Sequence, residues 1–137
     1  MSQQEKVELS VVIPAYNEEK RLGPTLMAVA DYFFSSGRNF EIIVVDDGSQ
    51  DGTRQVVEKM QREVFVRYRA GRLKLLSHEK NRGKGAAVKT GMLSAVGEIV
   101  LFTDADLSTP VTEFSKMEQA LMDGAEVAIA SRGLADS

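Results

Sequence analysis

The chain has 137 residues, 43% of them hydrophobic, which suits one globular domain with its own core and argues against disorder. Its 17 basic and 20 acidic residues give a net charge of -3 without a dense basic stretch, so we expect no nucleic-acid partner. The sequence contains no cysteine, which excludes disulfides, thiolate metal sites and a cysteine nucleophile.

The sequence shows no targeting or membrane segment. The polar tail over residues 1–7 lacks the apolar segment of a signal peptide. No run approaches the ~20 apolar residues that a membrane-spanning helix needs. We therefore expect a single domain over residues 1–137, located in the cytoplasm and without a transmembrane segment.

Short apolar runs and helical periodicities alternate along the sequence. The apolar runs predict strands over residues 9–13, 41–45, 73–76, 98–102 and 127–130. Apolar side chains at helical spacing predict helices over residues 22–33, 56–64, 86–95 and 114–121. Pro14 cannot donate to a ladder and should end the first strand, and Gly37 should end the first helix. Asp51 or Ser49 is expected to cap the second helix.

This alternation predicts an α/β fold, a Rossmann-like and mostly parallel sheet with helices on both faces. The third helix is rich in small residues and should lie close against the sheet; they are Ala86, Ala87, Gly91 and Ala95. In open sheets of this kind, ligands bind beyond the carboxyl ends of the strands. Polar residues follow nearly every predicted strand, so we expect a site at that edge of the sheet.

Two aspartates, Asp104 and Asp106, follow the fourth predicted strand. On an extended strand both carboxylates would point the same way, about 7 Å apart at a rise of roughly 3.3 Å per residue. Two acids side by side repel each other, and a divalent cation relieves that repulsion. Oxygen ligands suit Mg²⁺ and Mn²⁺, which commonly add phosphate oxygens and water to one or two carboxylates. The alternative is a pair of solvated acids at a strand end.

Other polar residues at this edge each have a functional and a structural interpretation. Tyr16 could stack on a base or be a half-buried aromatic at a strand end. Asp46 is expected to cap the turn into the second helix, whereas Asp47 is better placed to accept a hydrogen bond from a base or ribose. His78 is expected to be a surface histidine. Arg132 follows the fifth predicted strand in a glycine turn, where its rigid guanidinium could bind a phosphate.

Residues 81–85 resemble a phosphate cradle, because glycine-opened backbone amides and a helix amino end favour anions. Their lysine and arginine are otherwise ordinary solvated side chains. Glu18 and Glu19 most simply offset the dipole of the first helix. The glycine-rich signatures of dinucleotide folds, P-loop ATPases and sugar nucleotidyltransferases are absent from this sequence.

Four motifs in order carry a family resemblance. Residues 11–18 (VVIPAYNE), 44–49 (VVDDGS), 81–86 (NRGKGA) and 103–106 (TDAD) together resemble family 2 glycosyltransferases of the A-type fold. The branch most similar is that of the polyprenyl (dolichyl) phosphate hexosyltransferases, in which Leu-Ser also follows Asp-Ala-Asp. The resemblance covers residues 9–133, nearly the whole chain.

The resemblance implies a donor site for a nucleotide diphosphate sugar, linked to UDP or GDP and of the UDP-glucose or GDP-mannose class. The residues it places at the donor are Pro14, Ala15, Tyr16, Glu18, Asp47, Asn81, Gly83, Lys84 and Asp104. It implies that Asp104 and Asp106 hold Mg²⁺ or Mn²⁺, and that Asp106 and Arg132 are the catalytic residues. Transfer would be inverting, and a polyprenyl phosphate acceptor, already ionised, would need no general base.

Family catalytic domains normally continue beyond the motif at Ser131 and Arg132, whereas this sequence ends at Ser137. The chain is therefore expected to be the donor-binding portion of such an enzyme, acting at the cytoplasmic face of a membrane in its full-length context. We expect it to bind donor and transfer little sugar alone. An apolar face without its covering segments would favour a homo-oligomer.

Two alternative functions remain open from the sequence. One is a non-catalytic module that binds nucleotide sugars. The other is a haloacid dehalogenase-type phosphohydrolase, because residues 104–108 after an apolar strand resemble that family's nucleophile motif. The placement argues against it, since that motif should open the first strand of its domain.

Overall fold

The computed structural model describes residues 6–67, 71–106, 116 and 119, which contain one parallel sheet and its covering helices. In chain order the elements are β1 (Leu9–Ala15), α1 (Leu22–Ser35), β2 (Phe40–Asp47), α2 (Thr53–Glu63), the 3₁₀ helix η1 (Phe65–Arg67), β3 (Gly71–His78), α3 (Lys84–Ser94) and β4 (Ile99–Phe102). The strand predicted over residues 127–130 lies outside the described residues. Of the helix predicted over residues 114–121 only Lys116 and Gln119 are described, and both are helical.

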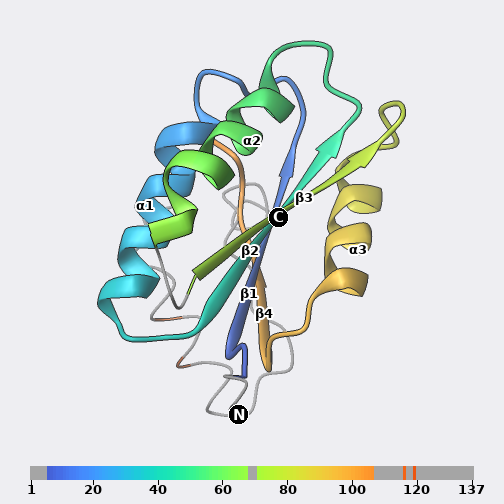
Figure 1. The fold of residues 1–137 in the computed structure, drawn as a ribbon. Helices are drawn as coiled ribbons and strands as arrows, with labels where there is room; N and C mark the ends of the chain where they lie inside the picture. Colours follow the sequence, from blue (N-terminus) through green and yellow to red (C-terminus); the bar gives the residue numbers. More distant parts are fainter. Residues whose placement is uncertain (1–5, 68–70, 107–115, 117–118, 120–137) are drawn as a thin grey trace.

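The four strands are all parallel and lie in the order β3-β2-β1-β4. Helices α1 and α2 cover one face of the sheet and α3 covers the other (Figure 1). The predicted α/β fold, a mostly parallel sheet with helices on both faces, is confirmed. The chain moves outward from β1 through β2 and β3 and then returns to the opposite side of β1 as β4. In open sheets such a reversal places a crevice at the carboxyl ends of the two diverging strands.

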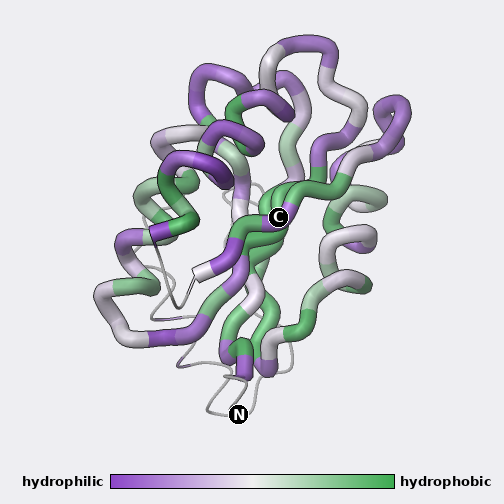
Figure 2. Tube along the Cα trace, in the orientation of Figure 1, coloured by the Kyte–Doolittle hydropathy of each residue, from purple (hydrophilic) through white to green (hydrophobic). Residues whose placement is uncertain are grey.

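Two hydrophobic cores hold these layers together. The larger core packs α1 and α2 against the sheet through residues such as Val11, Phe33 and Ile42. The smaller core packs α3 against Val12 and Ile43 on the other face. All eight residues of β2 are buried, as expected for a strand with a neighbour on each side and helices on both faces. Figure 2 shows the hydrophobic residues concentrated along the strands between the helices.

The strand β1 continues through Pro14 to Ala15, so the prediction that Pro14 ends it is wrong. Pro14 is in register with Val45 of β2. The carbonyl of Val12 accepts a hydrogen bond of 3.1 Å from the amide of Thr103, on the β4 side. Residues along a parallel strand alternate between their two neighbours, so Pro14 also faces the β4 side, beyond the end of that pairing. Its missing N–H therefore costs no ladder hydrogen bond.

The helix ends are set by backbone geometry more than by side-chain caps. Gly37 adopts a left-handed φ of 78° just after α1, which confirms it as the stop of this helix. The N-cap of α2 is Gly52, so the predicted cap at Asp51 or Ser49 is wrong. Asp51 acts one residue earlier, where it accepts a hydrogen bond of 2.9 Å from the amide of Thr53. In the described part of the chain, no helix is both long enough and apolar enough to cross a membrane.

Helix α3 lies close against the sheet, as its small residues predict. Ala87 and Gly91 are its buried residues. A Cβ atom on Gly91 would lie 2.4 Å from Val12 Cγ1 and 3.1 Å from Val45 Cγ2. Only a glycine therefore fits at this point of the helix without displacing the Val12 and Val45 side chains.

Replacing Gly91 with alanine should lower the free energy of unfolding by about 1–3 kcal/mol, because the added methyl group overpacks the contact with β1 and β2. Urea denaturation measures the change. Gly85→Ala in the same helix is the matched control, because its Cβ atom would meet nothing within 4 Å. That control should gain up to about 1 kcal/mol from reduced chain entropy. Equal stability of the two variants would contradict the close packing of α3.

Candidate functional site

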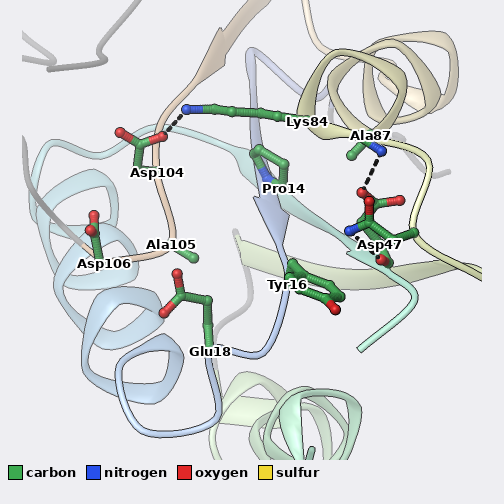
Figure 3. A pocket seen from close by; sticks show the side chains of 11 residues that line it. Pro14, Tyr16, Glu18, Asp47, Lys84, Ala87, Asp104, Ala105 and Asp106 are labelled. Atoms are coloured by element: carbon green, nitrogen blue, oxygen red, sulfur yellow. Dashed lines mark hydrogen bonds and ion pairs between the residues drawn. The ribbon is translucent and has the colours of Figure 1, made fainter. Parts of the chain in front are cut away.

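A cavity of about 480 Å³ opens where the chain reverses, at the carboxyl ends of β1 and β2 and beside the segment after β4. Its lining consists of Pro14, Tyr16, Glu18, Asp47, Asn81, Gly83, Lys84, Ala87, Asp104, Ala105 and Asp106. All of them except Ala87 come from the four motif segments, which are far apart in sequence. Figure 3 shows Glu18, Asp104 and Asp106 on one side of the cavity and Asp47 on the other, with Tyr16 between.

Three carboxylates, those of Glu18, Asp104 and Asp106, form what we call the acid wall. Their side chains are 18%, 20% and 35% exposed, respectively. The two aspartates do not lie on an extended strand as predicted, because β4 ends at Phe102 and the chain turns at Ala105 and Asp106. The strand spacing of about 7 Å therefore does not apply to them. Both nevertheless line the same cavity.

Two basic side chains pair with the acid wall. Lys84, the first residue of α3, forms an ion pair with Asp104. Arg21 Nη2 lies 2.9 Å from Glu18 Oε1, and Arg21 Nη1 lies 3.9 Å from Asp106 Oδ2. These cations reduce the repulsion among the three acids. The Lys84 and Arg21 side chains are 57% and 61% exposed, so each pair adds little to stability by itself.

Asp47, at the end of β2, organises the loop that precedes α3. Its Oδ1 atom accepts a hydrogen bond of 2.9 Å from the amide of Arg82, and its Oδ2 atom accepts one of 2.8 Å from the amide of Gly83. Burial would raise the pKa of Asp47, but hydrogen bonds from His78 and the two amides outweigh it and lower the pKa. Asp47 is therefore a carboxylate, and Oδ2 retains room for one further donor.

His78 is buried, only 9% exposed, and is not the surface histidine expected from the sequence. It is in register with Asp47 on the neighbouring strand, and its Nδ1 atom lies 2.8 Å from Asp47 Oδ1. Its Nε2 atom lies 2.9 Å from Thr90 Oγ1 on α3. The burial follows from α3 covering this end of β3, which sequence spacing alone does not reveal.

The loop after β1 is bound to the loop after β2. The amide of Asn17 donates to Ser49 Oγ at 2.8 Å, and the amide of Glu18 donates to Thr53 Oγ1 at 2.8 Å. Asp46 accepts a hydrogen bond of 3.3 Å from the amide of Ser49, which confirms its predicted role in capping this turn. These bonds fix the backbone of a loop whose side chains line the cavity.

The structure brings together every predicted site residue that it describes except Ala15. Ala15 is 3% exposed and packs in the larger core. Arg132 lies outside the described residues. Ala87 and Ala105 also line the cavity, and sequence reasoning missed them because a small apolar side chain carries no chemical signal.

The acid wall offers the hard oxygen donors that Mg²⁺ and Mn²⁺ prefer. Across residues 6–67, 71–106, 116 and 119, no three side chains of His, Cys, Asp or Glu form a complete metal site. A cation at Asp104 and Asp106 would therefore take its other ligands from a bound diphosphate and from water, as Mg²⁺ commonly does. The donor set fits such a metal.

Comparison with known proteins identifies the family of this chain. Residues 10–137 match the family described as Glycosyl transferase family 2. The sequence is 43% identical over 120 residues to dolichyl-phosphate beta-glucosyltransferase of Drosophila melanogaster, a match that covers 84% of this chain and 36% of that protein. The chain thus spans about a third of the length of the curated relatives it matches. The match sets aside the haloacid dehalogenase interpretation.

Solved structures share the fold. The mannosyltransferase PcManGT from Pyrobaculum calidifontis, in complex with GDP-Man and Mn²⁺, has a TM-score of 0.62 and 32% identity, covering 80% of this chain and 30% of that one. Glucosyl-3-phosphoglycerate synthase from Mycobacterium tuberculosis, with Mn²⁺, UDP and glucosyl-3-phosphoglycerate, has a TM-score of 0.63 and 25% identity, covering 87% and 40%. The chain therefore has the A-type glycosyltransferase fold and belongs to glycosyl transferase family 2.

Proposed function

We propose that this chain binds a nucleotide diphosphate sugar together with Mg²⁺ or Mn²⁺ and forms the donor side of an inverting hexosyltransferase. The observation that carries the proposal is that Asp47 and the acid wall lie on opposite sides of one cavity. A nucleoside diphosphate has a base with hydrogen-bond donors at one end and a metal-binding diphosphate at the other. The cavity presents a hydrogen-bond acceptor at one side and three carboxylates at the other, which supports this orientation.

The base would bind near Asp47 and Tyr16. Oδ2 of Asp47 has capacity for one more hydrogen bond, which a ring N–H of uracil or guanine would supply. Tyr16 follows the carboxyl end of β1 and is 45% exposed, so its ring offers a surface for stacking. The amides of Arg82 and Gly83 are already bound by Asp47, so this loop contributes its shape and the Lys84 cation.

The diphosphate would bind on the side of the acid wall. Asp104 and Asp106 would hold the divalent cation, which when bound stabilises the negative charge on the departing nucleoside diphosphate. Lys84 lies beside Asp104 and would contact the same anionic oxygens. Glu18, paired with Arg21, lines this end of the cavity.

We propose a polyprenyl phosphate as the acceptor, which the name of the Drosophila relative supports. An oxygen of the lipid phosphate would form a bond to the anomeric carbon while the bond from that carbon to the diphosphate oxygen breaks, with inversion. That phosphate is ionised at neutral pH, so no protein group has to remove a proton. Arg132 is proposed to face the acceptor phosphate. Donor and acceptor must be held together for this step, because positioning can supply roughly 7–11 kcal/mol of the acceleration.

Calorimetric titration with UDP-glucose, GDP-mannose, ADP-glucose and CDP-glucose, each with Mn²⁺ and with EDTA, tests the proposal. We expect binding that depends on Mn²⁺ and favours UDP or GDP, because uracil and guanine present a ring N–H to Asp47 whereas adenine and cytosine do not. Failure of all four donors to bind with Mn²⁺ would refute the proposed function. Equal binding of all four would remove Asp47 from base recognition.

A parallel assay with radiolabelled donor and a polyprenyl phosphate separates the enzyme from a non-catalytic binding module. Transfer above a control without protein would exclude the non-catalytic module, whereas donor binding with little transfer is the result expected of a donor-binding portion alone.

A further inference from the structure

The first turns of α1 contact the acidic turn after β4 at two points. Thr25 Oγ1 donates a hydrogen bond of 2.7 Å to the backbone carbonyl of Ala105, eighty residues later in the sequence. Arg21, one helical turn before Thr25, lies 3.9 Å from Asp106. Residues four apart in a helix share a face, so both side chains address the same turn. Nothing in the sequence marks Thr25 as part of a site.

The Thr25 hydroxyl donates its hydrogen bond to a residue outside α1, although a possible acceptor within the helix lies nearby. A threonine inside a helix commonly donates to the carbonyl four residues earlier, here that of Arg21. In this helix that carbonyl already accepts the amide of Thr25 at 3.2 Å. The hydroxyl instead reaches the carbonyl of Ala105 in a place where Thr25 is only 1% exposed. A buried carbonyl without a donor would be costly, so this bond specifies one position for the turn.

The carbonyl that Thr25 holds belongs to the residue between the two aspartates. The Ala105 side chain is itself 3% exposed and packs in the larger core. The centre of the turn is therefore anchored by both its side chain and its carbonyl, while Asp104 and Asp106 on either side line the cavity. Anchoring the middle residue fixes the two flanking carboxylates relative to each other.

We propose that Thr25 is a positioning residue for divalent-metal binding, an inference that rests on the proposed function. Mg²⁺ and Mn²⁺ need their oxygen ligands in a defined arrangement, so a turn that is free to shift would present one carboxylate at a time. Thr25 touches neither the metal nor the donor. It acts through the backbone of Ala105 to keep Asp104 and Asp106 available together. The Arg21 contact is largely exposed and contributes less.

The test compares Thr25→Val, Thr25→Ala and Thr25→Ser by calorimetric titration with UDP, in Mn²⁺ and in EDTA. Loss of the hydroxyl should reduce the gain in affinity that Mn²⁺ provides by about tenfold or more, the usual effect of removing a group that orients metal ligands. The affinity in EDTA should stay within twofold of the parent. Thr25→Ser keeps the hydroxyl and should retain the Mn²⁺ gain.

Ser36→Ala is the matched control. It removes a hydroxyl-to-carbonyl hydrogen bond of 2.9 Å, from Ser36 to Phe33, at the far end of the same helix. It should leave the Mn²⁺ gain unchanged. A purely structural role for Thr25 would lower thermal stability and leave the ratio of affinities in Mn²⁺ and EDTA unchanged, and that result would overturn the proposal. So would a serine variant that loses as much as the valine variant.

The failures of the two proposals are distinguishable. If the parent chain shows no Mn²⁺ gain with any nucleotide, the proposed function fails and this inference falls with it. If the parent shows the gain and both Thr25→Val and Thr25→Ala retain it, only the positioning role is wrong. Folding of each variant is checked first by circular dichroism, and the valine and alanine variants must give the same result.

Discussion

Replacing Asp106 with asparagine should lower the affinity for UDP in Mn²⁺ by about 10–100-fold and leave the affinity in EDTA unchanged. The substitution keeps the size of the side chain and removes the charge that a divalent cation requires. Asp106 lines the cavity with its side chain 35% exposed, so the neutral amide can be accommodated without repacking. Calorimetric titration of the variant in both buffers measures the effect.

The control for this prediction is Asp31→Asn, the same chemical change at an exposed position of α1. It should bind UDP like the parent chain in both buffers. A variant at Asp106 that keeps the parent's full gain in affinity from Mn²⁺ would show that the metal lies elsewhere. In that case the alternative interpretation would hold, in which the three acids of the acid wall are partly solvated and paired with Lys84 and Arg21.

The largest effect on stability is expected at Glu41, whose carboxylate is fully buried near the amino end of the sheet, opposite the cavity. Its Oε2 atom accepts hydrogen bonds from Ser10 Oγ at 2.5 Å and from the amide of Val96 at 2.9 Å. Its Oε1 atom lies 2.7 Å from Lys74 Nζ. Glu41→Ala should lower the free energy of unfolding by about 2–4 kcal/mol, because it leaves buried donors without an acceptor. Urea denaturation measures this loss.

Two further variants give the prediction its controls. Glu58→Ala replaces an exposed glutamate on α2 and should change stability by less than about 0.5 kcal/mol. Glu41→Gln keeps an acceptor for Ser10 and Val96 but loses the charge opposite Lys74. Its loss of unfolding free energy should therefore lie between those of Glu58→Ala and Glu41→Ala. An unchanged stability in Glu41→Ala would contradict the network.

The same network predicts how stability depends on pH. Burial would raise the pKa of Glu41, but hydrogen bonds from Lys74, Ser10 and Val96 outweigh it and hold the pKa below its ordinary value of 4.5. A carboxyl group whose pKa is lowered by folding stabilises the protein above that ordinary value, and this contribution is lost as the pH falls through the lowered pKa. The parent chain should therefore lose stability below about pH 4.5 more steeply than Glu41→Gln.

Much of the site was predictable because parallel strands end at one edge of a sheet. Once residues 9–13, 41–45 and 98–102 were identified as strands, the polar residues that follow them had to converge. Asp47, Asp104 and Asp106 do so, together with Lys84. Local sequence was sufficient here because each motif sits next to its own strand.

What the sequence did not reveal depends on partners that are distant along the chain. Pro14 remains in β1 because the pairing with β4 stops at Val12, which local sequence cannot show. His78 is buried because α3 covers it, and its hydroxyl partner Thr90 lies on that helix. The turn at Ala105 exists where Thr25 holds it, eighty residues away. Each of these features is specified by tertiary packing, whereas the hydrophobic periodicity of the sequence predicts only the local secondary structure.

The strand order also determines how the molecule can assemble as it is synthesised. The elements from β1 to β3 can pack one after another as they are made, because each strand pairs with the one before it. One edge of β1 stays unpaired until β4 pairs with it along Leu9–Val12. That edge is apolar, and an unpaired apolar strand is a template for association with other chains. Closing it requires a contact across about ninety residues, from Leu9 to Ile99, which is slow compared with local folding. We therefore expect the nascent chain to associate with other chains more readily before residue 102 emerges than after it. The acidic turn that completes the cavity follows β4 and can form only after this pairing.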